Sequence, residues 1–289
     1  MTLHFEKFPT VLGAEVTGVA LRDLTDPETL ARLRAGMDEH AVLVFRDQAL
    51  DSEQQLAFAQ RFDGTLHSKT SVAVLGKNRF GDEALTDISN VGADGEILSA
   101  DNRLRMSTIS NRLWHTDASF QNPPGRYSML SAHVVPPVRA DTEFADMRAA
   151  YDALEEATRA SLEGLQVFHS IAYSREVMGF EFSVQEKEQL QGAVHPLVRT
   201  LPRSGRRSLY LASHASHIVG MPVPEGRLIL RDLSEHATQP QFVYRHEWRV
   251  HDFVIWDNRT TMHRARPFDD KKYRRELRRT TTLDLPLPA

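Results

Sequence analysis

The stretch Trp114-His115-Thr116-Asp117 has the clearest capacity for chemistry in this sequence. Side chains alternate between the two faces of a strand, so His115 and Asp117 are predicted to point the same way. An imidazole beside a carboxylate supplies two ligands of a three-residue metal site. The third is predicted to be a histidine from far along the chain, and His263 is the best candidate. Two histidines and one carboxylate, with coordination positions left open, suit a non-haem Fe(II) oxygenase.

A run of arginines beyond His263 forms the second pattern, RRELRR over residues 274–279. Arg274 and Arg278 lie four residues apart, so on a strand they share a face, and we predict that both project into one cavity. A guanidinium binds a carboxylate through two parallel hydrogen bonds. Two inward arginines beside a metal therefore indicate two acidic ligands, a co-substrate and a substrate. The alternative is a solvated basic edge strand.

Composition excludes several classes of protein. An apolar fraction of 41% and a charged fraction of 26% are those of an ordinary globular chain. A net charge of -4 argues against a nucleic-acid partner. The absence of cysteine excludes disulfides, thiolate zinc sites, iron–sulfur clusters and a cysteine nucleophile. Without a signal peptide or a membrane-length apolar run, a cytoplasmic protein with no membrane partner is expected, and a homo-oligomer is left open.

Apolar periodicity and capping signals predict the elements that must position these side chains. Strands are predicted over residues 10–20 (as a strand or hairpin), 41–45, 127–135, 209–211, 242–256 and 274–285. Helices are predicted after Asp26, from a capping box of Ser52 and Gln55, from 146 or 147 to 164, after Ser183 and over 224–236. Residues 63–112 show no sustained period. They form either a mouth or lid over the metal site or an ordinary surface excursion.

Strands from both halves of the chain must converge if His115 and His263 are to share an ion. No repeat or linker interrupts the sequence, so we predict one domain over residues 1–289, mostly β with flanking helices. A jelly roll meets the requirement, because its two sheets are built from strands that are distant in sequence. A doubly wound fold is disfavoured, because strands and helices do not alternate and no glycine-rich phosphate loop follows a strand.

Segments along nearly the whole chain carry a resemblance to a known family: AVLVFRDQ (41–48), LWHTDASF (113–120), RYSMLSAHVVPP (126–137), DTEFADMRAAYDAL (141–154), HASHIVGMPVPEGR (214–227), EHATQPQFVYRH (235–246), WDNRTTMHRARPFD (256–269) and RRELRR (274–279). The chain resembles the taurine dioxygenase family of Fe(II)- and 2-oxoglutarate-dependent oxygenases. Within that family it is most similar to the 2,4-dichlorophenoxyacetate dioxygenase branch.

The resemblance implies a double-stranded β-helix, which agrees with the jelly roll required above. It implies that His115, Asp117 and His263 bind Fe(II). It also implies that Arg274 pairs with the distal carboxylate of 2-oxoglutarate and that Thr142 donates a hydrogen bond to the same group. O2 is the second co-substrate, and ascorbate is expected to stimulate turnover.

The remaining assignments concern the substrate. With Arg274 taken by 2-oxoglutarate, Arg278 is left for the acidic group of the substrate. His67 and Lys69 lie where substrate contacts are expected and could reach an anion. His214 and His217 are interpreted as structural or pocket-lining residues rather than iron ligands.

The reaction implied by the resemblance is hydroxylation coupled to the decarboxylation of 2-oxoglutarate to succinate and CO2. On an aryloxyacetate, hydroxylation beside the ether oxygen gives a hemiacetal that collapses to a phenol and glyoxylate. The same chemistry on a sulfonate, an alkyl sulfate or another small carboxylate is an alternative. A non-catalytic jelly roll that binds a metal and an acid is another. A zinc hydrolase would need a general base near the open positions, and we find no convincing one.

Overall fold

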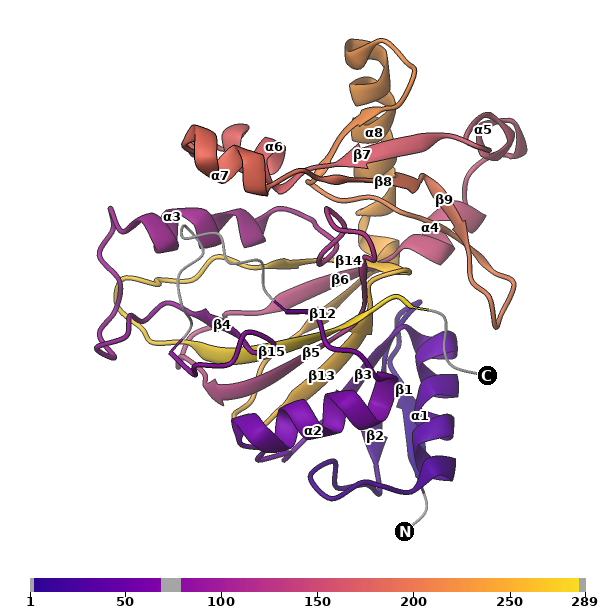
Figure 1. Cartoon of the computed structure of the whole chain (residues 1–289). Helices are drawn as coiled ribbons and strands as arrows, with labels where there is room; N and C mark the ends of the chain where they lie inside the picture. The colour runs from indigo at the N-terminus through magenta and orange to yellow at the C-terminus, as the bar shows by residue number, and fades with distance from the viewer. Residues whose placement is uncertain (1–2, 69–78, 286–289) are drawn as a thin grey trace.

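The computed structural model describes residues 3–68 and 79–285. Its centre is a jelly roll of two facing sheets (Figure 1). The larger sheet has seven strands in the order β1 (His4–Lys7), β2 (Ala14–Thr17), β3 (Val42–Phe45), β13 (Phe253–Asp257), β5 (Gly125–Val134), β15 (Glu276–Leu283) and β4 (Thr86–Ser89). The smaller sheet has the order β12 (Val243–His246), β6 (Thr142–Asp146) and β14 (Thr261–Ala265). Strands from both halves of the chain therefore lie side by side in each sheet, which is the convergence that was predicted.

The other elements cover this core. The helices are α1 (Pro27–His40), α2 (Ser52–Asp63), α3 (Arg103–Ile109), η2 (Ser110–Arg112), α4 (Met147–Asp152), α5 (Glu156–Ser161), α6 (Ile171–Glu176), α7 (Val184–Gln189), α8 (Val223–Ala237) and η3 (Pro240–Phe242). The outlying strands are β7 (Gln166–His169), β8 (Ala193–Pro196), β9 (Val198–Thr200), β10 (Arg207–Leu209) and β11 (Ala215–Ile218). Figure 1 shows β7, β8 and α8 on the side of the core opposite α1 and α2.

Strand β3 shows how the larger sheet is buried on both faces. Leu43 and Phe45 pack in the apolar cluster formed with α1 and α2. Val42 and Val44 point the other way and join the cluster that contains Phe144 of the smaller sheet. A strand covered on both faces reads as a continuous apolar run, which explains the pattern at 41–45. The doubly covered sheet is a rigid base for the side chains that β5, β13 and β15 carry.

Several element boundaries differ from the predictions. The capping box of α2 lies one residue earlier than predicted: Asp51 accepts from the amide of Gln54, whose side chain accepts from the amide of Asp51. The helix predicted to 164 is two helices, because the amide of Leu154 bonds to Tyr151 in a tight last turn of α4. Residues 242–256 form two strands in different sheets, joined by a turn in which His251 has a φ of 68°.

No helix in the described ranges 3–68 and 79–285 is long and apolar enough to cross a membrane.

Candidate active site

A backbone bridge joins the two histidines that lie far apart in sequence. The amide of His115 donates to the carbonyl of His263 over 3.0 Å, and the amide of His263 donates to that of His115 over 2.8 Å. Strand β14 carries His263 and pairs with β6 in the smaller sheet. The two imidazole rings consequently lie with their centres 4.2 Å apart. The fold itself therefore brings these two residues together.

Asp117 completes a buried three-residue cluster. Its Oδ1 lies 3.9 Å from His115 Nε2 and its Oδ2 lies 3.6 Å from His263 Nε2. The three donor atoms lie within 4.8 Å of one another, so they could hold one metal ion. The stretch is a single bridge followed by a turn rather than the regular strand predicted. The alternation still holds, since the Thr116 hydroxyl points away and donates to the carbonyl of Leu211.

The protonation of the cluster suits a divalent cation. His115 donates from Nδ1 to the carbonyl of Leu113 over 2.8 Å, which leaves its Nε2 lone pair toward Asp117. Burial lowers the pKa of His115 and holds that of His263 well below the usual range, so both rings are neutral. Burial raises the pKa of Asp117, but the charge of the Arg279 guanidinium and the hydrogen bond from Ser128 act against it and lower the pKa, so the carboxylate is ionised. Two neutral imidazoles and a carboxylate fit Fe(II).

A hydrogen-bond network behind the cluster fixes the carboxylate. The Ser128 hydroxyl donates to Asp117 Oδ2 over 2.7 Å, and Asn258 Nδ2 donates to the Ser128 hydroxyl over 2.9 Å. Asn258 Oδ1 accepts from the amide of Asp117 and from Trp256 Nε1, both over 3.1 Å. Asn258 thus holds both the backbone and, through Ser128, the side chain of Asp117.

We expect Asn258→Ala to lower metal affinity by about 10- to 100-fold, because outer partners of metal ligands contribute that much by orienting them. Titration of Mn(II) into the metal-free protein measures the change. Asn102→Ala is a matched control, because Asn102 caps α3 and makes no contact with the cluster. An Asn258→Ala variant that folds normally and binds Mn(II) as tightly as Asn102→Ala would contradict this expectation.

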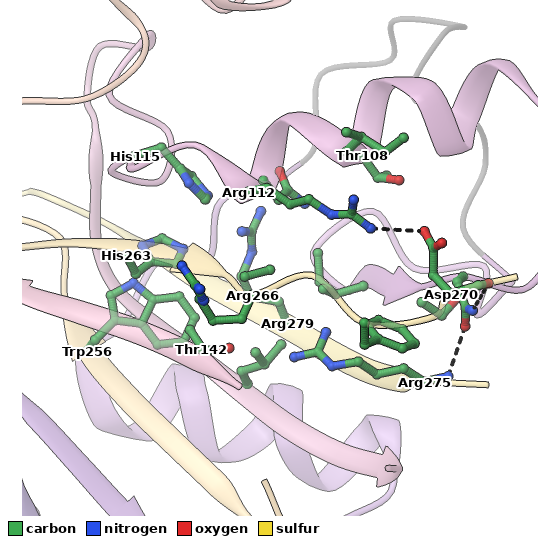
Figure 2. A pocket seen from close by; sticks show the side chains of 18 residues that line it. Thr108, Arg112, His115, Thr142, Trp256, His263, Arg266, Asp270, Arg275 and Arg279 are labelled. Atoms are coloured by element: carbon green, nitrogen blue, oxygen red, sulfur yellow. Dashed lines mark hydrogen bonds and ion pairs between the residues drawn. The ribbon is translucent and has the colours of Figure 1, made fainter. Parts of the chain in front are cut away.

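One cavity beside the cluster, here called the Thr142 cavity, is lined by residues from β6, β13, β14 and β15. Its polar lining includes Thr142, His115, His263, Arg275 and Arg279. Figure 2 shows the two histidines at one end of this cavity and the guanidinium of Arg275 directed toward Thr142. The Thr142 hydroxyl accepts from Trp248 Nε1 over 3.0 Å and keeps its own proton for another partner.

The side chain of Arg275 places a positive charge inside the protein, beside the Thr142 cavity. Arg275 is 7% exposed, and its guanidinium makes no ion pair with a carboxylate in the described part of the chain. Burial lowers the pKa of Arg275 to about 10, and Asp141 offsets only part of this effect. A buried charge is costly unless it is paired. Arg275 and Thr142 therefore form a site suited to a carboxylate that enters the cavity.

The predicted orientation of Arg274 and Arg278 is wrong. Arg274 has a side chain 51% exposed and donates to Glu276 over 2.7 Å. Arg278 faces α2, where it donates to the hydroxyl of Ser52 over 2.9 Å. Residues four apart do share a face of the strand, as expected, but the face that points into the cavity is the one that carries Arg275 and Arg279. Leu277 is fully buried and anchors that face, which Arg275 and Arg279 share with it.

A second cavity, here called the His67 cavity, meets the first at His115 and Arg279, which line both. It is lined by His67, where a substrate contact was expected, by Asp117 and by His214, which agrees with the pocket-lining interpretation. Lys69 lies outside the described residues. Apolar side chains cover much of the remaining wall: Ile88, Val91, Leu104, Phe120 and Ile171.

The irregular stretch before the metal cluster contributes to both cavities. Ile88 and Ser89 of β4 and Thr108 of α3 line the Thr142 cavity and the His67 cavity alike. Of the two interpretations of residues 63–112, the described part therefore favours a mouth of the site over a surface excursion.

Comparisons with known proteins agree with this geometry. Residues 4–281 match the family "Taurine catabolism dioxygenase TauD, TfdA family". The chain is 46% identical over 284 residues to the alpha-ketoglutarate-dependent 2,4-dichlorophenoxyacetate dioxygenase of Burkholderia sp. (strain RASC), covering 98% of this chain and 95% of that protein. It is 29% identical to the alkylsulfatase of Acinetobacter baylyi, covering 91% of this chain and 80% of that protein.

A solved structure is similar over its whole length. The crystal structure of AAD-2 in complex with Mn(II) and N-oxalylglycine superposes with a TM-score of 0.93 at 46% identity, covering 98% of each chain. The match of fold, sequence and buried His-Asp-His cluster leads to one conclusion. The chain belongs to the TauD, TfdA family and is a dioxygenase.

Proposed function

We propose that this enzyme is an Fe(II)- and 2-oxoglutarate-dependent dioxygenase that hydroxylates an aryloxyacetate such as 2,4-dichlorophenoxyacetate. The products are a phenol and glyoxylate, with succinate and CO2 from 2-oxoglutarate. The observation that carries the proposal is that two cavities meet at His115, beside a carboxylate and a second histidine, and that arginine side chains line both cavities. Sequence relatives with 2,4-dichlorophenoxyacetate dioxygenase activity support the substrate class.

His115, Asp117 and His263 are the residues that would hold Fe(II). When bound, Fe(II) supplies the activation of O2 that couples decarboxylation of 2-oxoglutarate to hydroxylation of the substrate. Among the described residues, the cluster contains no fourth histidine, aspartate or glutamate, so the side that opens to the cavities would be free for small molecules. Asp117 is oriented for this task by Ser128 and by Asn258.

Thr142 and Arg275 are proposed to bind the distal carboxylate of 2-oxoglutarate. Arg275 takes the role first given to Arg274, because Arg275 is the one directed into the Thr142 cavity. Bound in this way, 2-oxoglutarate would extend from Arg275 toward His263 and His115, which lie at the other end of the cavity. Each end of the cavity thus matches one carboxylate of a dicarboxylic acid.

The substrate is proposed to occupy the His67 cavity. Arg278 is not retained as the residue for its acidic group, because its side chain faces α2 and does not line this cavity, whereas Arg279 does. His67 is retained as a polar contact on the same wall. The apolar lining, which includes Phe120 and Ile171, suits an aromatic ring better than a short polar tail.

Hydroxylation at the carbon between the ether oxygen and the carboxylate needs that carbon to face the metal cluster. An acid group held close to His115 places the neighbouring carbon there, while the ring extends along the apolar wall. One oxygen atom of O2 enters the substrate and the other enters succinate. The hemiacetal then loses the phenol as its leaving group and leaves glyoxylate, so no further catalytic residue is required.

We also propose that residues 1–289 act as one catalytic domain in the cytoplasm, without a nucleic-acid or membrane partner. The net charge of -4 supports the absence of a nucleic-acid partner.

A panel of acids tests the proposed substrate. Succinate release and product formation are measured with Fe(II), 2-oxoglutarate and O2 for phenoxyacetates, an alkyl sulfate, a sulfonate and an aliphatic carboxylate. We expect the phenoxyacetates to give matched amounts of succinate and phenol and the highest kcat/KM. A higher kcat/KM for the alkyl sulfate, the chemistry of the Acinetobacter baylyi relative, would show that the substrate class is wrong.

A further inference from the structure

A second arginine of the His67 cavity, Arg175 of α6, is placed unusually for a charged side chain. The residue is 8% exposed and lines the cavity. It makes no ion pair with a carboxylate among the described residues 3–68 and 79–285. Its Nε is buried without a hydrogen-bond partner. A buried and unpaired guanidinium is costly, so a purely structural role would be served better by an ion pair or a neutral side chain.

The protein bonds only one part of this guanidinium. Its Nη1 donates to the hydroxyl of Ser174 over 2.9 Å and to Nε2 of His214 over 3.1 Å. The other two nitrogens, Nε and Nη2, have no partner in the described part of the chain. Those two nitrogens form one edge of the guanidinium plane, and such an edge matches the two oxygens of a carboxylate.

Hydrogen bonds behind Arg175 hold it in this orientation. Because arginine only donates, His214 must accept at Nε2, so its Nδ1 carries the proton and donates to the Ser119 hydroxyl over 3.2 Å. The Ser119 hydroxyl in turn donates to Nδ1 of His169 over 3.1 Å. All three of these residues are buried. Burial holds the pKa of His214 well below its usual value, so it is a neutral acceptor rather than a competing cation.

The position of Arg175 relates it to the reacting centre. The ring of His214 lies edge-on to that of the metal-cluster residue His115, with ring centres 6.1 Å apart. Arg175 is therefore one imidazole away from the cluster. Arg279 lines the same cavity, but it already pairs with Asp117. Asp117 therefore balances the charge of Arg279. Arg175 is the buried arginine of this cavity that has no carboxylate partner among the described residues.

We propose that Arg175 is a substrate-binding residue that holds the carboxylate of the organic acid through its free edge. This inference rests on the proposed function and deepens it, because it states which group selects an acid over its neutral analogue. A carboxylate on Arg175 compensates the buried charge and lies beside the metal cluster. The adjacent carbon is then the one presented for hydroxylation, and the aryl ring lies against Phe120 and Ile171 of the same cavity.

Binding measured by calorimetry without O2, in the presence of Fe(II) and 2-oxoglutarate, tests this role apart from turnover. The probes are phenoxyacetate and its neutral analogue 2-phenoxyethanol. We expect Arg175→Gln to weaken phenoxyacetate binding by about 30-fold or more, as loss of one partner of a buried charge pair does. Binding of 2-phenoxyethanol should change by less than about threefold, because no charge pair is lost. The KM for 2-oxoglutarate should be unchanged.

Two further variants make the result specific. Arg103→Gln removes an exposed arginine that contacts Glu186 outside the cavity, and it should bind phenoxyacetate like the wild type. Arg175→Lys keeps the charge but not the planar edge, and it should bind with intermediate affinity. Should Arg175→Gln fail to fold, the lysine variant decides the matter by the same comparison: weaker binding supports the role, and unchanged binding overturns it.

The possible failures are distinguishable. Equal loss of phenoxyacetate and 2-phenoxyethanol in a folded Arg175→Gln variant would assign the arginine to packing and overturn the inference. Wild-type affinity for phenoxyacetate in that variant would overturn it as well, and the proposed function would stand. A wild-type protein that binds no phenoxyacetate at all would overturn both.

Discussion

Asp117→Ala is expected to abolish 2-oxoglutarate turnover, with succinate formation reduced to background. Asp117 is the one carboxylate of the buried cluster, and its two oxygens face His115 and His263 separately. Removing it leaves two neutral imidazoles, which hold a divalent cation much more weakly. It also leaves Arg279 beside the site without its partner. Metal affinity should fall by more than about 100-fold, the upper end of the effect of a partner that only orients a ligand.

The measurements are Mn(II) binding and succinate release at saturating 2-oxoglutarate. Asp87→Ala is the matched control for metal binding: Asp87 lines the His67 cavity but pairs with Arg79 over 2.7 Å rather than joining the cluster. Its Mn(II) affinity should equal that of the wild type. Near-normal succinate formation by Asp117→Ala, or equal loss of Mn(II) affinity in both variants, would refute the assignment of Asp117 as a ligand.

The metal cluster could be predicted from sequence because its chemistry restricts residue types. His115 and Asp117 are two residues apart, so any locally extended backbone points them to one side, and a bridge followed by a turn does so as well as a strand. A three-residue metal site requires His263 to lie beside His115 and Asp117, but the sequence does not show which strand pairing places it there. The arrival depends on β14 pairing with β6 and on the backbone bridge between the two histidines. Those contacts are tertiary, and no local pattern specifies them.

The arginine run at 274–279 was correctly predicted to alternate between two faces of a strand, but the wrong face was predicted to point into the cavity. When both faces of a strand carry charged residues, charge alone does not show which face points inward. Leu277 indicates the inward face, because the one apolar residue of the run is expected to face the core. Arg275 and Arg279 lie on the same face as Leu277. The opposite face carries Glu276, which pairs with Arg274 and with Arg79. Charge complementarity on that face is the signature of its outer position.

Arg175 had no comparable signal. It lies in α6, a helix of six residues, where a serine and a glutamate flank it and nothing distinguishes it from a solvated arginine. Its significance comes from burial and from bonding to His214, a residue 39 positions away. Such a role becomes visible only when the three-dimensional surroundings of the charge are known.

Arg275→Ala is expected to raise the KM for 2-oxoglutarate by about 30-fold or more, because truncating one partner of a buried, hydrogen-bonded charge pair has that effect or a larger one. The distal carboxylate would lose the buried cation that is directed toward Thr142 and would keep the hydroxyl of Thr142. kcat at saturating 2-oxoglutarate should fall much less, because Arg275 does not touch the reacting end. Metal affinity should be unchanged, which separates this variant from Asp117→Ala.

Arg274→Ala is an unusually close control, since it removes the same side chain one residue away. Arg274 is half exposed and pairs with Glu276 on the outer face, where an ion pair contributes little. We expect its KM for 2-oxoglutarate to stay within about threefold of the wild type, the scale of a surface pair. If Arg274→Ala raised that KM as much as Arg275→Ala, the outward face would have to contribute to the site. If Arg274→Ala alone raised it, the inward direction of Arg275 would be irrelevant to co-substrate binding.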